Sequence, residues 1–161
     1  MDAPRKVLPR EELAARLRAA RAAGRSAVLC NGVFDLLHVG HVRALAEARA
    51  LGDLLVVAVN DDASAARLKG PDRPLVPAAE RSEVLAALAC VDFVTVYGED
   101  TAAETLRLLQ PAVHAKGRDY DAGRIPAEEQ RVAAELHIRL ALVGDEKRRS
   151  SSELARRLRC R

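Results

Sequence analysis

The amino-acid sequence predicts an α/β fold, a single doubly wound (Rossmann-like) domain with a five-stranded parallel sheet flanked by helices. Short apolar runs alternate along the chain with segments of helical periodicity. The chain has 161 residues, of which 49% are hydrophobic, and this is enough for one sizeable core. Such alternation places helices on both faces of a parallel sheet, where ligands bind at the carboxyl ends of the strands.

The expected elements follow from these patterns in chain order. The segment 27–31 is a short apolar run of strand character, whereas apolar residues in 39–51 recur at helical spacing up to Gly52. Thr101 and Glu104 have the spacing of a capping box. By the same reasoning, strands are expected at 27–31, 54–60, 92–97, 112–116 and 138–143, and helices at 10–23, 39–51, 78–89, 101–109, 127–136 and 151–158. Residues 1–25 are expected as a helical extension packed on a domain of residues 26–161.

The composition favours a small anionic partner. The formal net charge is only +3, and the chain has two tyrosines, two phenylalanines and no tryptophan, which is little for a nucleic-acid binder. The longest apolar runs are too short to span a bilayer, and the N-terminus carries no apolar signal segment. We therefore expect a cytoplasmic protein with no nucleic-acid partner and no membrane partner.

The stretch 32–41, Gly-Val-Phe-Asp-Leu-Leu-His-Val-Gly-His, lies between the first of these strands and the following helix. Unsatisfied N–H groups at a helix N-terminus bind anions such as a triphosphate. His38 and His41 share one face of the first turn, where they can donate hydrogen bonds to phosphate oxygens. Gly32 permits close approach of the backbone, and Gly40 leaves room for a flat group. The stretch predicts a phosphate-handling site.

Two histidines three residues apart can also be half of a metal site. The other two, His114 and His137, are remote in the sequence, and the three cysteines lack ligand spacing. We therefore expect no metal held by protein side chains.

The pattern Gly-x-Phe-Asp-x-x-His-x-Gly-His resembles that of the His-x-Gly-His nucleotidyltransferase superfamily, in its cytidylyltransferase-like branch. The resemblance implies that His38 and His41 are catalytic. Asp35 is assigned to substrate binding, and we expect it to orient the loop backbone. It is not needed as a base, because a phosphate monoester is already a nucleophile near neutral pH. The residues expected to bind the nucleotide and its phosphates here are Asn31, Gly32, Val33, Phe34 and Gly40.

Three further candidates follow the second strand. Lys69 lies in a Leu-Lys-Gly loop, and Arg81 lies near the start of the helix expected at 78–89. Each has an ordinary explanation, as a solvated loop lysine and as a surface or helix-pairing arginine. The resemblance favours a catalytic Lys69 that contacts the substrate phosphates and an Arg81 that holds a substrate phosphate. Asp61 is assigned to substrate binding.

Two segments after the fourth and fifth strands complete the expected site. The first, Lys-Gly-Arg-Asp-Tyr, could surround a base or ribose, or be only a charged loop. Its expected nucleotide contacts are Lys116, Gly117, Asp119 and Tyr120. In the second, hydroxyls and N–H groups at the start of the last helix can wrap a triphosphate, although Ser150 and Glu153 could instead form only a capping box. Its expected contacts are Arg149, Ser150, Ser151 and Ser152.

With these segments, about 28–158 resembles the adenylyltransferase domain of bacterial ADP-heptose synthase, and 26–161 is thus expected to be a nucleotidyltransferase domain. The resemblance implies transfer of AMP from ATP to a sugar 1-phosphate, D-glycero-β-D-manno-heptose 1-phosphate, giving ADP-heptose and pyrophosphate. It also implies Mg²⁺ bound through the phosphates, and a homodimer as one expected assembly. The chain departs from the family at Arg118, where glycine is usual, at Asp61, where serine is frequent, and in Ser-Ser-Ser, which replaces Ser-Thr-Thr.

Other functions are compatible with the same motif. One is a cytidylyltransferase for glycerol 3-phosphate or a related alcohol phosphate, and another is an FMN adenylyltransferase. A nucleotide-binding regulatory protein without turnover is the non-enzymatic alternative, against which the intact histidines, lysines and serines argue.

Overall fold

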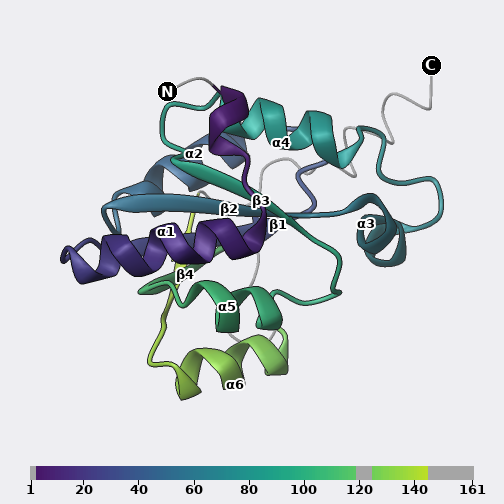
Figure 1. Ribbon diagram of the computed structural model, residues 1–161. Coiled ribbons are helices and arrows are strands. Elements are labelled where there is room, and N and C mark those ends of the chain that lie inside the picture. The colour runs from purple at the N-terminus through teal and green to yellow at the C-terminus, as the bar shows by residue number, and fades with distance from the viewer. Residues whose placement is uncertain (1–2, 119–124, 145–161) are drawn as a thin grey trace.

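The computed structural model describes residues 3–118 and 125–144 of the protein. A five-stranded parallel sheet forms its centre, in the order β3-β2-β1-β4-β5 (Figure 1). Because β1 pairs with both β2 and β4, the strand order reverses beside β1. The predicted doubly wound α/β fold is confirmed. The strands are β1 (Ala27–Gly32), β2 (Leu54–Asn60), β3 (Phe93–Tyr97), β4 (Val113–Gly117) and β5 (Arg139–Val143).

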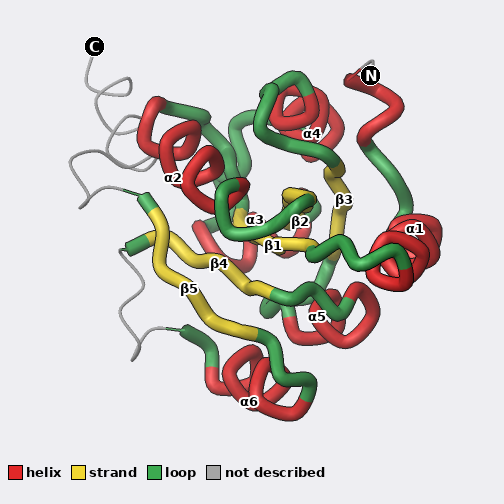
Figure 2. The backbone as a smooth tube through the Cα atoms, turned by 90° about the vertical axis from the view of Figure 1, so that its left-hand side faces the viewer, coloured by secondary structure: helices red, strands yellow, loops and turns green. Residues whose placement is uncertain are grey.

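Helices cover both faces of the sheet (Figure 2). One face carries α2 (Val39–Arg49) and α4 (Ala78–Ala86), and the other carries α1 (Arg10–Ala22), α5 (Ala103–Leu109) and α6 (Ala127–Glu135). The remaining helices are η1 (Ala3–Lys6), a short 3-10 helix, and α3 (Asp62–Lys69), which follows β2. The segment after η1 covers the edge of β3, where the Leu8 N–H donates to the Val94 carbonyl over 2.9 Å.

The hydrophobic core has one layer on each face of the sheet. Leu29 and Val56 face α1, α5 and α6, whereas Val28 and Leu55 face α2 and α4. All seven residues of β2 are buried, as expected for a parallel strand covered on both sides. Leu13 of α1 is fully buried in the first layer, so the described part of the expected extension contributes to the same core. The boundary at residue 25 stays a prediction.

The strand register brings the carboxyl ends of the strands to one edge. Asn60, the last residue of β2, lies beside Tyr97, the last residue of β3. Near the end of β1, Cys30 lies beside Ala115 of β4. The segments that follow these strands therefore emerge together, at the edge where ligands bind in folds of this kind.

Most element boundaries lie within three residues of the predicted ones, but the predicted capping box is wrong. The helix α5 begins only at Ala103, without a side-chain cap. The Thr101 hydroxyl instead donates to Glu128 of α6 over 3.0 Å, so it ties two helices together. The helix expected at 151–158 lies outside the described residues. Among the described helices, none has both the length and the apolar character needed to cross a membrane.

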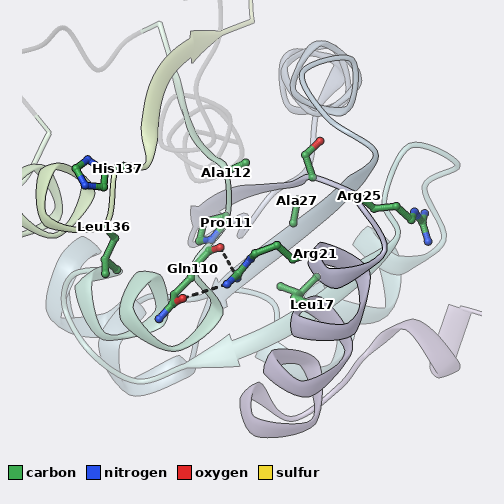
Figure 3. A pocket seen from close by; sticks show the side chains of 11 residues that line it. Leu17, Arg21, Arg25, Ala27, Gln110, Pro111, Ala112, Leu136 and His137 are labelled. Atoms are coloured by element: carbon green, nitrogen blue, oxygen red, sulfur yellow. Dashed lines mark hydrogen bonds between the residues drawn. The ribbon is translucent and has the colours of Figure 1, made fainter.

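A cavity of about 410 Å³ lies at the opposite, amino end of the sheet (Figure 3). Helices α1, α5 and α6 all end beside it. Arg21 of α1 donates to the Gln110 carbonyl over 2.7 Å and to its side-chain oxygen over 3.1 Å, and His137 also lines the cavity. This end is therefore closed mainly by helix termini.

Candidate active site

Residues 32–41, which we name the phosphate-binding turn after the role predicted for them, connect β1 to α2 at the carboxyl edge of the sheet. Since β1 is the middle strand, the turn lies beside the point where the strand order reverses. Val33 and Asp35 are buried, whereas Val39 is 55% exposed. The turn is thus anchored where it leaves the sheet and open to solvent where α2 begins.

His38 and His41 cap the N-terminus of α2. The Nδ1 atom of His38 accepts a hydrogen bond from the Gly40 N–H over 3.1 Å, and Nδ1 of His41 accepts from the His38 N–H over 3.3 Å. A neutral imidazole whose Nδ1 accepts carries its proton on Nε2. Both rings, with centroids 4.0 Å apart, are therefore set to act as donors through Nε2.

The shape of the turn depends on two glycines and on Phe34. A Cβ at residue 40 would lie 2.9 Å from Cε1 of His38, so the flat group that Gly40 accommodates is the imidazole of His38 itself. A Cβ on Gly32 would lie 3.2 Å from the Phe34 ring. Phe34 has a φ of 51°, a left-handed conformation that is unfavourable for a bulky residue. The turn therefore stores backbone strain next to the histidines.

Asp35 joins the turn to the loop that precedes α4. One carboxylate oxygen accepts from the N–H groups of Leu75 over 2.8 Å and Val76 over 3.0 Å, and the other pairs with Arg73. Burial alone would raise the pKa of Asp35, but these hydrogen bonds and the Arg73 guanidinium lower it below its ordinary value. The carboxylate orients the loop backbone, and its assignment to substrate binding stays a prediction.

Arg81 is 1% exposed and holds the other side of the turn. Its guanidinium donates to the carbonyls of Val33, Asn60 and Val76, the last two over 2.9 Å and 2.8 Å, and pairs with Asp62 over 2.7 Å. Arg81 therefore ties the end of β2 to the turn after β1. The contact with a substrate phosphate is untested, and the guanidinium is bonded here to the protein's own acceptors.

Asp61 and Lys69 lie at opposite ends of α3. Asp61 is the N-cap residue, and its Oδ1 accepts from the Ser64 N–H over 2.7 Å. Lys69 is the last residue of the helix and is exposed. Helix capping is enough to explain Asp61. The predicted contacts of both residues with substrate are untested.

Lys116 lies inside the layer formed by α5 and α6. Its ammonium pairs with Glu129 of α6 over 2.7 Å, and the two side chains are 5% and 1% exposed. The second oxygen of Glu129 accepts from the Ala102 N–H at the start of α5 over 2.9 Å. This pair links the end of β4 to two helices. Binding of a phosphate by Lys116, and of the nucleotide by the adjoining Gly117, stays a prediction.

Arg118, which stands where the family that the sequence resembles usually has glycine, binds neighbouring groups of the protein. Its Nε donates to the Gly144 carbonyl over 2.6 Å, and its guanidinium pairs with Glu47 of α2 over 3.0 Å. Glu47 also accepts from the Gly144 N–H over 2.7 Å. Gly144 has a φ of 86°, and a Cβ there would lie 2.9 Å from Cβ of Ala44. These contacts join the ends of β4 and β5 to the helix that carries His41.

Part of the predicted site cannot be compared with the structure. The predicted residues outside the described ranges are Asp119, Tyr120, Arg149, Ser150, Ser151 and Ser152. Within 3–118 and 125–144, no group of three or more His, Cys, Asp or Glu side chains is arranged to hold a metal ion.

Sequence reasoning missed four polar residues that lie beneath this edge, each at most 2% exposed. They are Asn60, Tyr97, His114 and Glu129. For the first three a signal existed, because a polar residue in a strand expected to be buried on both faces needs a partner. Glu129 gave no such signal, since it lies in a helical segment rich in charged residues.

The fold and the histidine-capped turn together place the protein in a class, the α/β nucleotidyltransferases. The chain belongs to the cytidylyltransferase-like family, whose model matches residues 29–157. The resemblance stated from the sequence is thereby confirmed.

The chain is similar to several bifunctional HldE proteins. It is 50% identical to that of Geotalea uraniireducens over 128 residues and 52% identical to that of Halorhodospira halophila over 122 residues. These matches cover 80% and 76% of this chain but 26% of each relative, so the chain spans about a quarter of their length. The crystal structure of the lipopolysaccharide core biosynthesis protein from Thermoplasma volcanium is similar with a TM-score of 0.65 and 27% identity, covering 77% of this chain and 100% of that one.

Proposed function

We propose that the protein transfers AMP from ATP to D-glycero-β-D-manno-heptose 1-phosphate, giving ADP-heptose and pyrophosphate. Membership of the cytidylyltransferase-like family supports nucleotidyl transfer. The choice of a heptose phosphate is supported by the similarity to the HldE proteins and to a lipopolysaccharide core biosynthesis protein.

The orientation of His38 and His41 carries the proposal. Because both Nδ1 atoms accept backbone N–H groups, both Nε2–H donors are fixed before substrate binds. Negative charge develops on phosphate oxygens during transfer, and prearranged donors stabilise that charge without reorganisation. The N-terminus of α2 adds its own partial positive charge at the same place.

The reaction is a direct in-line displacement. An oxygen of the sugar phosphate attacks the α-phosphorus of ATP, the bond from that phosphorus to the bridging oxygen breaks, and pyrophosphate leaves with the electron pair. His38 and His41 stabilise charge on the α- and β-phosphates, and the exposed Lys69 holds the reacting phosphates. Arg81 and Asp35 fix the turn and the loop beside it, so their contribution is to positioning.

Mg²⁺ is the implied cofactor. The carboxylates of Asp35, Asp61 and Asp62 already accept hydrogen bonds from protein N–H groups, which fits an ion held by the phosphate oxygens of ATP. Bound there, Mg²⁺ neutralises charge on the triphosphate. The segment 149–152 is proposed to hold the triphosphate tail, and Asp119 and Tyr120 the nucleoside.

Release of pyrophosphate tests the proposal. The full chain is incubated with Mg²⁺ and either ATP or CTP, each paired with the heptose 1-phosphate, glycerol 3-phosphate or FMN. We expect release only with ATP and the heptose phosphate. A variant with His38→Asn and His41→Ala is the matched control, because asparagine still caps a helix while the imidazole donors are lost.

The other outcomes have distinct meanings. Release with CTP and glycerol 3-phosphate, or with ATP and FMN, would replace the proposed substrates by those of a sister activity. ATP binding without release in any pair would favour the regulatory alternative. Light scattering on the same preparation tests the homodimer that the resemblance implies as one assembly, which would have twice the 17.4 kDa of one chain.

A further inference from the structure

Four polar side chains, three buried and one (Asn31) partly buried, form a hydrogen-bonded row across the sheet, on the face covered by α5 and α6. We call this row the polar relay; its members are His114 of β4, Asn31 of β1, Tyr97 of β3 and Asn60 of β2. Nε2 of His114 lies 2.9 Å from Oδ1 of Asn31. Asn31 donates to the Tyr97 hydroxyl over 3.0 Å, and that hydroxyl donates to Asn60 over 3.0 Å. The side-chain amide of Asn60 donates to the Ser64 hydroxyl over 3.2 Å, where the row ends.

The chemistry at the head of the relay sets its direction. The Glu129 carboxylate lies 3.9 Å from Nε2 of His114, so it favours a proton on that nitrogen. Nδ1 of His114 is buried and has no hydrogen-bond partner among the described residues, so a proton there would be an unsatisfied donor. Burial, with a smaller effect from Lys116, lowers the pKa of His114 to about 3. The imidazole is therefore neutral, with its proton on Nε2.

The relay ends at the backbone that shapes the site. Asn31 directly precedes Gly32, the first residue of the phosphate-binding turn, and Asn60 directly precedes Asp61. From the opposite face of the sheet, Arg81 donates to the carbonyls of Val33 and of Asn60 itself. The start of the turn and the end of β2 are thus held from both faces by hydrogen bonds, partly buried at Asn31 and buried at Asn60, and such bonds strengthen one another where water is excluded.

We propose that the polar relay positions the phosphate-binding turn, with a neutral His114 as its first donor and Tyr97 as the link that spans from β3 to β1. Within the relay its members are positioning residues, because they act through the backbone of Asn31 and Asn60 and not on the reacting atoms. The contact of Asn31 with the nucleotide is a separate prediction. The proposal rests on the proposed function only for its effect on turnover. Its geometric part is independent of any substrate.

The geometric part is tested by NMR of the histidine side chains. The chain has four histidines, so long-range ¹H–¹⁵N spectra can be assigned with a His114→Gln variant. We expect His114 to show the neutral tautomer protonated on Nε2 at every pH from 5 to 8. A proton on Nδ1, or titration within this range, would overturn the proposal.

The positioning part is tested with Tyr97→Phe, which removes one hydroxyl and keeps the ring. Thr95→Val is the matched control: Thr95 lies two residues earlier in β3, on the same face, is fully buried, and has a hydroxyl with no hydrogen-bond partner among the described residues. We expect Tyr97→Phe to shift the imidazole resonances of His38 and His41, and Thr95→Val to leave them in place. These shifts are measured without substrate.

On turnover, we expect Tyr97→Phe to lower kcat by roughly tenfold or more with a smaller change in KM, as small displacements of reacting groups do. Thr95→Val keeps the wild-type kcat. Shifted imidazole signals in an enzyme that is inactive on every substrate pair would support the relay and count against the proposed function. Unshifted signals, or equal effects of the two variants, would overturn the relay as a positioning device even if the enzyme is active.

Discussion

The two ends of the sheet bury polar groups in opposite ways. At the carboxyl end, side chains from distant parts of the sequence satisfy one another and the backbone, as Arg81 and Glu129 do. At the amino end, backbone groups mostly bond to other backbone groups. The Arg25 N–H donates to the Ala20 carbonyl at the end of α1, and the Ile138 N–H donates to the Ala133 carbonyl at the end of α6. Helix ends of this kind are closed by hydrogen bonds between backbone groups and not by capping side chains.

Left-handed residues show the same contrast. Gln110 and His137, at the amino end, have φ of 45° and 56°, and each directly ends or follows a helix. Phe34, at the carboxyl end, has a similar φ of 51° but ends no helix; it lies in the turn that carries the histidines. The same backbone conformation therefore terminates helices at one end and shapes the site at the other. We expect changes at the carboxyl end to alter turnover and changes at the amino end to alter stability alone.

The largest effect is expected from the histidines. His38→Asn and His41→Ala should each lower turnover by roughly 10²–10³-fold, because each removes a donor to developing charge. Pyrophosphate release measures this. His38→Ala should in addition cost about 1 kcal/mol of stability through the lost helix cap, whereas His38→Asn should not. Wild-type turnover in a variant lacking both imidazoles would contradict the assignment.

Glu129→Gln should destabilise the protein by about 3–5 kcal/mol, because it removes the carboxylate charge that pairs with the buried Lys116 ammonium. The glutamine oxygen can still accept from the Ala102 N–H, so the measured loss of stability reports the missing charge and not a missing hydrogen bond. Urea unfolding measures it. Adding Lys116→Met should restore much of the stability; if the double variant is no more stable than Glu129→Gln, the ion pair is not the cause.

Substitutions of Arg81 distinguish a role in positioning the turn from direct contact with substrate. Arg81→Met should cost about 2–4 kcal/mol, since the buried carbonyls of Val33 and Asn60 lose their donor. We expect Arg81→Lys to fall between wild type and methionine in both stability and kcat. A lysine variant with unchanged unfolding but a raised KM for the sugar phosphate would instead indicate that Arg81 holds substrate.

The pH dependence of stability can be compared for two carboxylates, Asp35 at the carboxyl end of the sheet and Asp53 at the amino end. The pKa of Asp35 lies below its ordinary value of 3.8, so its contribution to stability is complete above that value and is lost as pH falls through the lower folded pKa. Asp35→Asn should therefore make stability less dependent on pH below 4. Asp53, exposed at the amino end and held by Ser26, also has a lowered pKa. In urea titrations at pH 3 to 5, we expect Asp53→Asn to change the free energy of unfolding less than Asp35→Asn does. The reverse order would contradict the difference between the two ends of the sheet.

The smallest effect is a gain in stability at the amino end. His137→Gly should stabilise the protein by about 0.5–1 kcal/mol, because glycine adopts a left-handed φ without strain but is more flexible when unfolded. Thermal unfolding should show a Tm higher by about 2–4 °C per kcal/mol. Gln110→Gly should gain less, since Gln110 also accepts from Arg21. A change in turnover in either variant would show that this end is coupled to the site.

The fold was predictable because its signals are local. The predicted strand at 54–60 has the bounds of β2, and the other strands differ by one residue. Helix ends were less accurate: the helix expected at 78–89 stops at Ala86, because the following residues close a turn in which the Leu88 N–H donates to Leu85. The capping box at Thr101 failed since its hydroxyl finds a partner 27 residues away.

The site was predictable only where its residues are close in sequence. The turn with His38 and His41 is one local unit, and its motif was enough to find it. The partners of Arg81 and Lys116 are carbonyls and a carboxylate supplied by other elements, so the sequence showed two cations near strand ends but not what they bind. Burial of a cation depends on packing that no short motif records.

The reach of Tyr97 over β2 has a consequence for the order of folding. The hydrogen bonds of the polar relay join residues separated by 83, 66 and 37 positions, from four different strands. Contacts of such long range carry a high loop-closure cost, so the relay should form after the sheet has assembled. We expect a φ-value near zero for Tyr97→Phe: stopped-flow experiments should show faster unfolding and an unchanged folding rate. The phosphate-binding turn would then take its final shape as one of the last steps by which the chain reaches its native state.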